Sequence, residues 1–367
     1  MCRIYISQNV PNAYVKRYNL SQAANNFCLH INNIGLFKRH FAVPPGCVDA
    51  SFKSFVDGRI GIEYHICRPF RHRGIGKILN ILLDNLWLYY RVSKNKEQNI
   101  WFYNVWSGNL LSYLFIRFLS LKKTFILLAD YNPMRYRNLF GKILLWAIKK
   151  ADGVISLSAR CSEVNTNFKS IPGIIPEISI NKSSGVFHSN KAFLLSGTLN
   201  ANTGLFLALD VFKKIPEAKL YLSGGLDANN LKIVEKYTRQ YPNIIYKGFY
   251  EDFGEYMKLF HSVDFILSLR DPDSPVNRYN FPSKILETLT YNKIVISTIE
   301  YPELNGLNYI VLPYSENELR NSIKQIIVEG ESARIKLCLN NTGLLRMKYT
   351  ETVWARTFRE IETNKKS

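Results

Sequence analysis

The stretch that decides the fold runs from residue 264 to residue 298 and reads DFILSLRDPDSPVNRYNFPSKILETLTYNKIVIST. Two short apolar runs, 264–270 and 293–298, enclose a polar segment and a predicted helix over 283–291. Short continuous apolar strands joined through a helix are typical of βαβ crossovers, in which helices cover both faces of a parallel sheet. The stretch therefore predicts an α/β fold with a parallel sheet.

The same alternation extends through the rest of the second half of the chain. The predicted strands are AFLLSG (192–197), KLYLSGG (219–225), NIIYKG (243–248) and YIVL (309–312), with helices over 203–214, 228–240 and 251–261. Polar residues and glycines follow several of these strands, as in SGT at 196–198, SGG at 223–225 and Arg270. Parallel sheets bind ligands outside the carboxyl ends of their strands, so we expect a binding site at this edge.

The first half shows a less regular version of the pattern. The predicted strands are RIYIS (3–7), FCLHI (27–31), IGIEYHI (60–66), NIWFYNV (99–105), TFILLADY (124–131) and GVISLS (153–158), and the predicted helices are 74–92, 108–120 and 135–151. Residues 170–190 are rich in Pro, Gly, Ser and Asn, which is typical of a linker between domains. A chain of 367 residues favours two domains, and we expect them at 1–185 and 186–348.

The C-terminal segment 349–363 has the periodicity of an amphipathic helix. Its apolar residues Val353, Trp354, Phe358 and Ile361 are expected on one stripe. We expect this helix to pack back on the first domain.

Composition points to a globular protein of a reducing compartment. Hydrophobic residues make up 47% and charged residues 21%, as in ordinary globular chains. The six cysteines are scattered without metal-ligand spacing, so free thiols are expected. The N-terminus does not resemble a signal peptide, and no apolar run of 18 residues is free of charge. We therefore expect a cytoplasmic protein.

The net charge of +19 is unevenly distributed. Residues 1–185 contain 25 Lys/Arg and 9 Asp/Glu, whereas residues 186–367 contain 23 and 20. Bases interleaved with aromatic residues suit an anionic membrane surface better than nucleic acid. The clusters RPFRHR (68–73) and FIRFLSLKK (115–123) are the expected contact points, and the interleaved aromatics are Trp87, Tyr89, Tyr90, Trp101, Phe102, Trp106, Phe115 and Trp146. Some of these aromatics must fill the core.

The segment NRYNFPSKILE gathers polar groups where a helix begins. Pro282 suits the first turn, and Ser283 and Lys284 follow where free backbone N–H groups attract an anion. Arg270 can add a second cation, and Glu287, one turn further along, can accept hydrogen bonds from a ribose diol. Diphosphate and ribose together indicate a nucleotide ligand. In the alternative interpretation, Ser283 only caps the helix, Lys284 is solvated, and Glu287 pairs with Lys284 or another base.

Several segments together resemble the C-terminal domain of the GT-B-fold, sugar-nucleotide-dependent glycosyltransferases of the group 1 (retaining) type. They are FLLSGTLNANTGL, KLYLSGG, NIIYKGFY, VDFILSLRDP and FPSKILETLTYNKIVIST, in the order and spacing of that family. The resemblance covers residues 190–300, Trp354 fits the returning C-terminal helix, and over the first half the likeness is only architectural. It implies two Rossmann-like parallel-sheet domains facing each other across a cleft.

The resemblance also implies roles for individual residues of a donor site. The glycine turn Gly197-Thr198 would approach the diphosphate, with Gly224 in the neighbouring SGG turn. Arg270 and Lys284 would neutralise the diphosphate with help from the Ser283 N–H, and Glu287 would hold the ribose. The donor-binding set is thus Gly197, Thr198, Gly224, Arg270, Ser283, Lys284 and Glu287.

The sequence departs from the family pattern at two places. Tyr279 stands eight residues before Glu287, where the family has the glutamate that contacts the transferred sugar. Tyr279 and Asn280 are therefore the candidates for contacting that sugar. The segment SGTLNANTG also lacks the Arg and Lys that usually follow the first strand, so Arg270 and Lys284 are expected to supply that charge.

We expect no metal and no cofactor. Cationic side chains can stabilise a departing diphosphate, and the sequence has no His/Cys cluster. Asp271 and Asp273 alternate in RDPDSP, but they fall in a loop, where solvated carboxylates are the simpler interpretation.

Asp130 in LLADYNP ends a predicted buried strand and is the candidate for handling the acceptor hydroxyl, as general base or orienter. Glu63 and His65 lie two apart on a strand, and a core or helix-packing role is expected for them. The catalytic candidates are Asp130, Arg270 and Lys284.

The function expected on these grounds is transfer of a hexose from a nucleotide-diphosphate sugar, with UDP-hexose favoured. The acceptor would be a glycan or a polyprenyl-diphosphate-linked glycolipid in cell-surface polysaccharide synthesis of the O-antigen or lipopolysaccharide kind. The protein would act peripherally on the inner face of the cytoplasmic membrane. Two alternatives remain: a sugar-nucleotide epimerase or hydrolase of the same fold, and a non-catalytic nucleotide-sugar or membrane-binding module.

Overall fold

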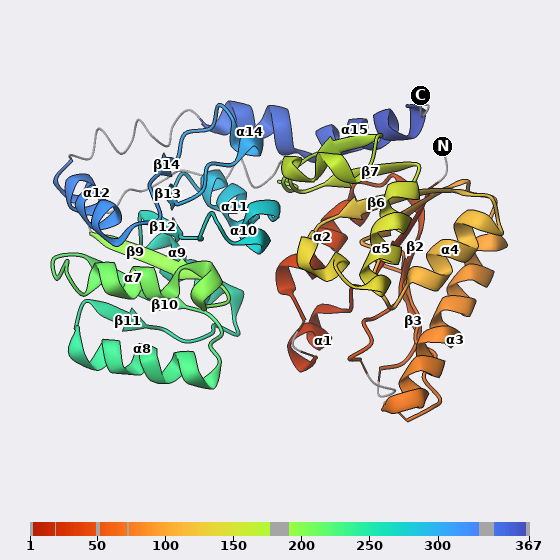
Figure 1. Ribbon diagram of the computed structural model, residues 1–367, viewed down its shortest axis with the longest axis horizontal. Helices are drawn as coiled ribbons and strands as arrows, with labels where there is room; N and C mark the ends of the chain where they lie inside the picture. The colour runs from red at the N-terminus through yellow and green to blue at the C-terminus, as the bar shows by residue number, and fades with distance from the viewer. Residues whose placement is uncertain are drawn as a thin grey trace. The chain divides into compact units, whose positions relative to one another are not determined.

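The computed structural model describes residues 3–18, 20–48, 52–71, 73–176, 191–329 and 341–364. The chain divides into two compact units (Figure 1). The first unit contains the residues up to Pro176 and those from Tyr349 onward, and the second runs from Glu177 to Lys348. The C-terminal segment therefore belongs to the first unit, as the sequence predicts.

The first unit is built on an eight-stranded sheet of order β3-β4-β2-β1-β5-β6-β7-β8. All neighbouring strands are parallel except β3 and β4, which are antiparallel. The strands are β1 Arg3–Ser7, β2 Phe37–Ala42, β3 Phe55–Asp57, β4 Ile62–Tyr64, β5 Asn99–Tyr103, β6 Lys123–Leu128, β7 Gly153–Ser156 and β8 Phe168–Ser170.

Helices cover both faces of this sheet. They are α1 Asn12–Arg17, α2 Gln22–Asn33, α3 Gly74–Ser93, α4 Leu110–Phe118, α5 Leu139–Lys150 and α15 Glu351–Thr363, with 3₁₀ turns η1 Pro133–Tyr136 and η2 Ala159–Val164. Consecutive residues of β5 show the two layers, because Trp101 contacts Phe358 of α15 and Phe102 contacts Tyr113 of α4. Successive strand residues point to opposite faces, so α15 and α4 lie on different sides of the sheet.

The expected strand FCLHI (27–31) is wrong, because these residues lie within α2. Ser21 caps this helix by accepting a hydrogen bond from Ala24 N at 3.2 Å. The buried residues Asn25, Cys28 and Ile31 recur every third position and form one helical face. The strand instead follows as β2, FKRHFA. Its consecutive Lys, Arg and His residues interrupt the alternation of apolar and polar residues that identifies a strand.

The C-terminal helix α15 is tied to the first strand by a buried ion pair. Arg3 donates from Nε and from one terminal nitrogen to the two carboxylate oxygens of Glu362, each at 2.7 Å. Trp101 Nε1 donates to the same carboxylate at 2.8 Å. Trp354, Phe358 and Ile361 are buried alongside, whereas Val353 is partly exposed and does not belong to the buried stripe.

The second unit contains a six-stranded, fully parallel sheet of order β11-β10-β9-β12-β13-β14. Its strands are β9 Ala192–Ser196, β10 Lys219–Ser223, β11 Ile244–Tyr246, β12 Phe265–Ser268, β13 Ile294–Ser297 and β14 Ile310–Val311. Each strand predicted in this half is present, so the prediction of a parallel α/β sheet is confirmed.

Helices lie between consecutive strands of the second unit, and α12 and α14 follow the last strand. They are α7 Leu205–Phe212, α8 Ala228–Gln240, α9 Phe253–His261, α10 Pro275–Tyr279, α11 Lys284–Thr290, α12 Glu316–Val328 and α14 Asn341–Tyr349, with 3₁₀ turns η3 Ala201–Thr203 and η4 Pro302–Leu304. Alternate residues of β9 enter two different clusters: Phe193 packs with Phe265 and Phe212, whereas Leu194 packs with Ile266 and other residues on the opposite face. Both faces of the sheet are therefore covered, which explains the continuous apolar strands.

Among the described residues, no helix is long and apolar enough to cross a membrane.

The buried ion pair predicts a large loss of stability when one partner is neutralised. Glu362→Gln leaves Arg3 charged and buried, so the free energy of unfolding of the first unit should fall by about 3–5 kcal/mol. The matched control is Glu360→Gln on the same helix, because Glu360 pairs with Lys169 where both side chains are about 40% exposed. That variant should lose less than about 1 kcal/mol. Urea unfolding followed by tryptophan fluorescence measures both; equal losses would contradict the assignment.

Candidate functional site

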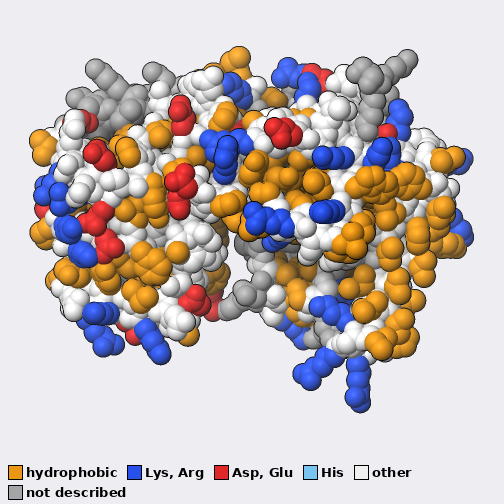
Figure 2. All heavy atoms as spheres, viewed as in Figure 1, with side chains coloured by type: hydrophobic (Ala, Val, Ile, Leu, Met, Phe, Trp, Pro, Cys, Tyr) orange, Lys and Arg blue, Asp and Glu red, His pale blue; other side chains and the backbone are white. Residues whose placement is uncertain are grey.

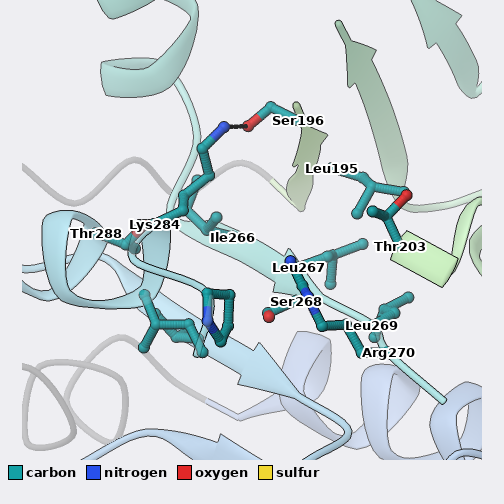
Figure 3. Close-up of a pocket in the computed structure, with 13 residues that line it drawn as sticks. Leu195, Ser196, Thr203, Ile266, Leu267, Ser268, Leu269, Arg270, Lys284 and Thr288 are labelled. Carbon is teal, nitrogen blue, oxygen red and sulfur yellow. Dashed lines mark hydrogen bonds between the residues drawn. The ribbon is translucent and has the colours of Figure 1, made fainter. Parts of the chain in front are cut away.

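A small open pocket lies at the carboxyl ends of two neighbouring strands in the second unit (Figure 3). Ser196 ends β9, Ser268 ends β12, and Arg270 follows β12, while Lys284 and Thr288 come from α11. The pocket has room for about 60 Å³, which fits a few waters or a phosphate group but not a whole nucleotide. A larger ligand would extend beyond it along the strand ends.

Lys284 is held at this pocket by side chains from two other elements. Its Nζ donates to Ser196 Oγ at 2.9 Å, and Ser196 Oγ lies 3.1 Å from the hydroxyl of Tyr256 on α9. The same Nζ lies 5.5 Å from the centre of the Tyr256 ring. Figure 3 shows the lysine reaching from α11 to the end of β9. The ammonium group is therefore oriented before any ligand binds.

Burial shifts the ionisation of Lys284 and Glu287 in opposite directions. Loss of water lowers the pKa of Lys284, an effect that the charge of Glu287 opposes. Loss of water also raises the pKa of Glu287, against the charge of Lys284. The Glu287 side chain still reaches solvent, so surrounding protein atoms reduce the hydration of its carboxylate without enclosing it. Perturbed groups of opposite charge at one site are typical of functional positions.

Two parts of the alternative interpretation, the Ser283 cap and the solvated Lys284, do not fit these contacts. Ser283 is exposed and makes no side-chain cap to α11, and Lys284 is bonded to Ser196 rather than solvated. Within the described part of the chain, no ion pair joins Glu287 to a base. Glu287 therefore interacts with Lys284 only through its charge, and its exposed carboxylate can still bind a ligand.

Two glycines lie close together after β9 and β10, and one of them, Gly197, is next to Lys284. Gly197 has φ +117° and Gly224 has φ +146°, which side-chain-bearing residues rarely adopt. A Cβ on Gly224 would lie 1.7 Å from the carbonyl oxygen of Gly197, and a Cβ on Gly197 would lie 3.8 Å from Lys284 Nζ. Gly224 itself is buried, and both its N–H and its C=O are bonded, to Gly248 and Tyr246. Because Gly224 has no side chain, the backbone of the Gly197 turn can lie directly against it.

Thr198 follows Gly197 and is exposed. Its carbonyl oxygen accepts a hydrogen bond from the hydroxyl of Thr203 at 2.8 Å, which fixes the loop after β9. Its side chain therefore remains at the surface beside the glycine turn.

Arg270 lines the pocket from the end of β12. Thr298 holds its backbone on both sides, accepting from Arg270 N at 2.7 Å and donating to Arg270 O at 2.6 Å. One guanidinium nitrogen lies 3.4 Å from Oδ1 of Asn277, which is fully buried and donates to the carbonyls of Asn202 and Asp271. Because this one contact is long, most of the five guanidinium donors remain available to an anion.

Asp271 and Asp273 lie in a turn after β12, as expected, and a short helix, α10, that was not predicted follows between them and α11. Tyr279 ends this helix, and Tyr279 and Asn280 are half-buried. Asp273 N donates to Asp271 Oδ1 at 2.9 Å, so the first aspartate closes a turn. Among the residues with described positions, no group of three or more His, Cys, Asp and Glu could hold a metal ion.

The remaining candidates lie in the first unit. Asp130 follows β6 and its side chain reaches solvent. Nearby protein atoms reduce the hydration of its carboxylate and raise its pKa, and the charge of Arg135 opposes the shift. Arg135 in turn lies 5.4 Å from the ring centre of Trp106. The charge that acts on Asp130 thus comes from its own unit. Arg270, Lys284 and Glu287 belong to the second unit.

Glu63 and His65 pack against α3, in agreement with the structural role expected for them. His65 stacks on Trp87 with ring centres 3.5 Å apart, and Glu63 accepts a hydrogen bond from Arg91 at 2.7 Å. Burial, reinforced by the charge of Arg91, lowers the pKa of His65 to about 4. A neutral stacked imidazole suits packing.

Three residues that shape the pocket were not predicted from the sequence. Tyr256 orients Ser196 from α9, a helix that carries no motif. Asn277 holds Arg270 from α10, which was not predicted. Thr288 is fully buried, lines the pocket, and its hydroxyl has no hydrogen-bond partner within the described structure. Thr288 could have been predicted from the sequence, because it is a polar residue on the expected buried side of the helix, directly after Glu287.

Solved structures of low sequence identity share the fold over the full length of the chain. Sucrose-phosphate synthase from Thermosynechococcus elongatus aligns with a TM-score of 0.70 at 11% identity, covering 99% of both chains. A glycosyltransferase from Rickettsia africae gives 0.68 at 13%, also covering 99% of both. UDP-GlcNAc 2-epimerase from Neisseria meningitidis, bound to UDP-GlcNAc, gives 0.58 at 12% and covers 98% of this chain and 100% of its own.

No protein-family model matches the chain, and no curated protein matches its sequence. The similarity to solved structures establishes a GT-B, glycosyltransferase-like fold with two Rossmann-like units.

The lowered pKa of Lys284 predicts a pH-dependent affinity for anions. Binding of UDP should weaken as the pH rises through this pKa, before an ordinary lysine would lose its proton, because only the ammonium form attracts the diphosphate. Lys284→Met should bind UDP about 2 kcal/mol more weakly and lose this dependence. Calorimetry between about pH 7 and pH 10 measures both, with Lys258→Met on the exposed side of α9 as control. A flat wild-type profile over this range would count against the assignment.

Proposed function

We propose that the protein transfers a hexose from a nucleotide-diphosphate sugar to an acceptor hydroxyl. The observation that carries the proposal is the Lys284 ammonium held by Ser196 and Tyr256 at the edge of a parallel sheet, beside the Gly197 turn. Arg270 supplies a second cation on the same pocket, and the carboxylate of Glu287 is in no ion pair among the described residues. Two cations and a carboxylate match a diphosphate followed by a ribose.

The cations act on the leaving group. When the bond between the anomeric carbon and the phosphate oxygen breaks, negative charge develops on the nucleoside diphosphate. Lys284 and Arg270 stabilise that charge and therefore favour the transition state over the bound donor. The same task is often given to a metal ion, and here we assign it to side chains, so activity should not require one.

The acceptor loses a proton as its oxygen attacks the anomeric carbon. We assign this proton to Asp130, acting as general base or as an orienter of the hydroxyl. Because partial loss of water raises the pKa of the exposed Asp130, its carboxylate is more basic than that of a fully solvated aspartate. Tyr279 and Asn280 are the residues we assign to contact with the transferred sugar.

UDP-hexose is the favoured donor, and the acceptor is proposed to be a glycan or a polyprenyl-diphosphate-linked glycolipid used in cell-surface polysaccharide synthesis. The excess of bases in residues 1–185 supports an anionic partner for the first unit. A lipid-linked acceptor at the cytoplasmic face of a membrane satisfies this requirement, and we therefore propose peripheral attachment to that face.

A sugar-nucleotide epimerase or hydrolase is the second candidate. The similarity to an epimerase structure supports it, because such an enzyme uses the same donor site without an acceptor surface. A non-catalytic nucleotide-sugar module is the third, since Tyr279 occupies the position where a carboxylate was expected.

Glu287→Gln tests the ribose assignment. Loss of a charge-assisted hydrogen bond should weaken nucleotide binding by about 1.5–3 kcal/mol. The melting temperature should change little, because the carboxylate of the exposed Glu287 is in no ion pair or hydrogen bond among the described residues. Titration with UDP, GDP, ADP, CDP and dTDP measures the effect. Glu235→Gln on the exposed face of α8 is the matched control. Unchanged affinity for all five nucleotides would refute the role of Glu287.

Asp130→Asn separates acceptor chemistry from donor binding. The amide is nearly the same shape but cannot accept the proton, so turnover should fall by about 100-fold or more while the affinity for UDP stays the same. The measurement is steady-state transfer from labelled donor, with Asp57→Asn in the first unit as control. Wild-type turnover would leave Asp130 as a structural residue after β6.

A further inference from the structure

The long helix α3 of the first unit buries polar side chains and exposes apolar ones over its first twelve residues. Asn80, Asp84 and Asn85 are buried, whereas Ile75 is 76% exposed and Ile78 is 60% exposed. Only farther along the helix are apolar residues buried. A helix at the surface of a water-soluble domain normally has the opposite arrangement.

Hydrogen bonds fix this orientation. Asp84 accepts from Cys67 N at 2.7 Å and pairs with Arg68 at 3.4 Å. Asn80 bonds to both the N–H and the C=O of Phe70, at 3.1 and 3.0 Å. Asn85 links α3 to α4, donating to Gly108 O at 2.7 Å and accepting from Ser112 N at 2.8 Å. Rotating the helix to bury its apolar side would break all of these bonds.

The exposed apolar surface continues over α4 and α5. Ring contacts join the three helices, with Tyr89 and Phe115 centred 5.7 Å apart and Phe118 and Trp146 centred 5.8 Å apart. Leu119 after α4 is 62% exposed and Leu139 of α5 is 78% exposed. Figure 2 shows a broad hydrophobic area over this part of the unit. We call this surface the α3–α5 face, defined by Ile75, Ile78, Leu86, Leu119, Leu139 and Trp146.

Exposed bases accompany the face. Residues 68–150 contain fifteen Lys/Arg and three acids, Asp84, Glu97 and Asp130, of which the first two are buried beside bases. The exposed bases at the start of α3 and along α5 are Arg71, Arg73, Lys77, Lys142, Lys149 and Lys150. The face therefore combines apolar side chains with positive charge.

The two clusters expected from the sequence to contact a membrane are only partly suited to it. Arg68 is buried against Asp84, Lys122 is buried, and Arg117 pairs with Asp152. Trp101 and Phe102 are likewise fully buried. The bases that remain outside these contacts in the first cluster are those at the start of α3.

We propose that the α3–α5 face inserts into the interfacial region of an anionic lipid bilayer. Apolar side chains enter the acyl boundary while neighbouring Lys and Arg bind lipid phosphates, as in interfacial helices. Charge favours lipid over a second copy of this chain, because a two-fold contact would bring the same basic surface against itself. The inference specifies the membrane partner of the proposed function, but it is independent of the donor site.

Co-sedimentation of the full-length chain with vesicles tests the proposal. Phosphatidylcholine vesicles with about 30 mol % phosphatidylglycerol should bind the protein, and raising salt from about 0.05 to 0.5 M should weaken binding about tenfold or more. The triple variant Ile75→Ser, Ile78→Ser, Leu139→Ser should bind about tenfold or more weakly than wild type at low salt. The control is Val328→Ser with Met347→Ser, equally exposed apolar residues of the second unit.

Quenching by brominated lipid gives a second readout. Trp146 is 44% exposed on this face, so its fluorescence should be quenched by bromine on the acyl chain, and Trp146→Phe should remove most of that quenching. Attachment by charge alone would leave acyl-chain bromine without effect and would overturn insertion.

Three further results would overturn the proposal. They are absence of binding at low salt, equal binding of the triple and control variants, and a concentration-dependent dimer that the triple variant abolishes. UDP titration of the triple variant separates failure of the membrane proposal from failure of the proposed function. The substitutions lie outside the donor site, so the variant should bind UDP as wild type does, whatever the result with vesicles.

Discussion

The candidate site depends on one constraint: helices cover both faces of the parallel sheet in the second unit. Helices bury β9 and β12 from both sides, so polar groups of these strands can meet a ligand only where the strands end. Ser196 and Arg270 lie at those ends, and the crossover through α11 returns Lys284 to the same place. Chemistry that is scattered over nearly ninety residues of sequence is thereby gathered in one pocket.

Polar interactions have a different role in the first unit. Arg3, Trp101 and Glu362 join the first strand, a central strand and the last helix through buried hydrogen bonds. Asn80, Asp84 and Asn85 similarly fix α3, with its apolar side outward. Buried polar groups thus specify how the helices are placed, and the apolar surface that they leave exposed is available to a partner.

Much of the second unit was predictable because its strands are continuous apolar runs separated by helices of clear periodicity. In the first unit FCLHI was misassigned, since a short apolar run fits a strand and a buried helical turn equally well. The carboxylate and cations of the site were found from the local motif, and their roles remain predictions.

The partners that orient the site were not predictable from that motif. Tyr256 lies 60 residues from Ser196 in sequence and carries no signal linking the two. The aromatic segments of the first half also gave no indication of which side chains face outward, because α3 reverses the usual pattern.

Product analysis by mass spectrometry tests the central claim most directly. The full-length chain is incubated with nucleotide sugars, UDP-hexoses first, and short polyprenyl-diphosphate-linked glycans. Transfer predicts an acceptor heavier by one hexose residue and an equal amount of released nucleoside diphosphate, with or without EDTA. Donor consumed to free sugar or to an epimer while the acceptor mass is unchanged, or a donor that is bound and never consumed, would contradict the account.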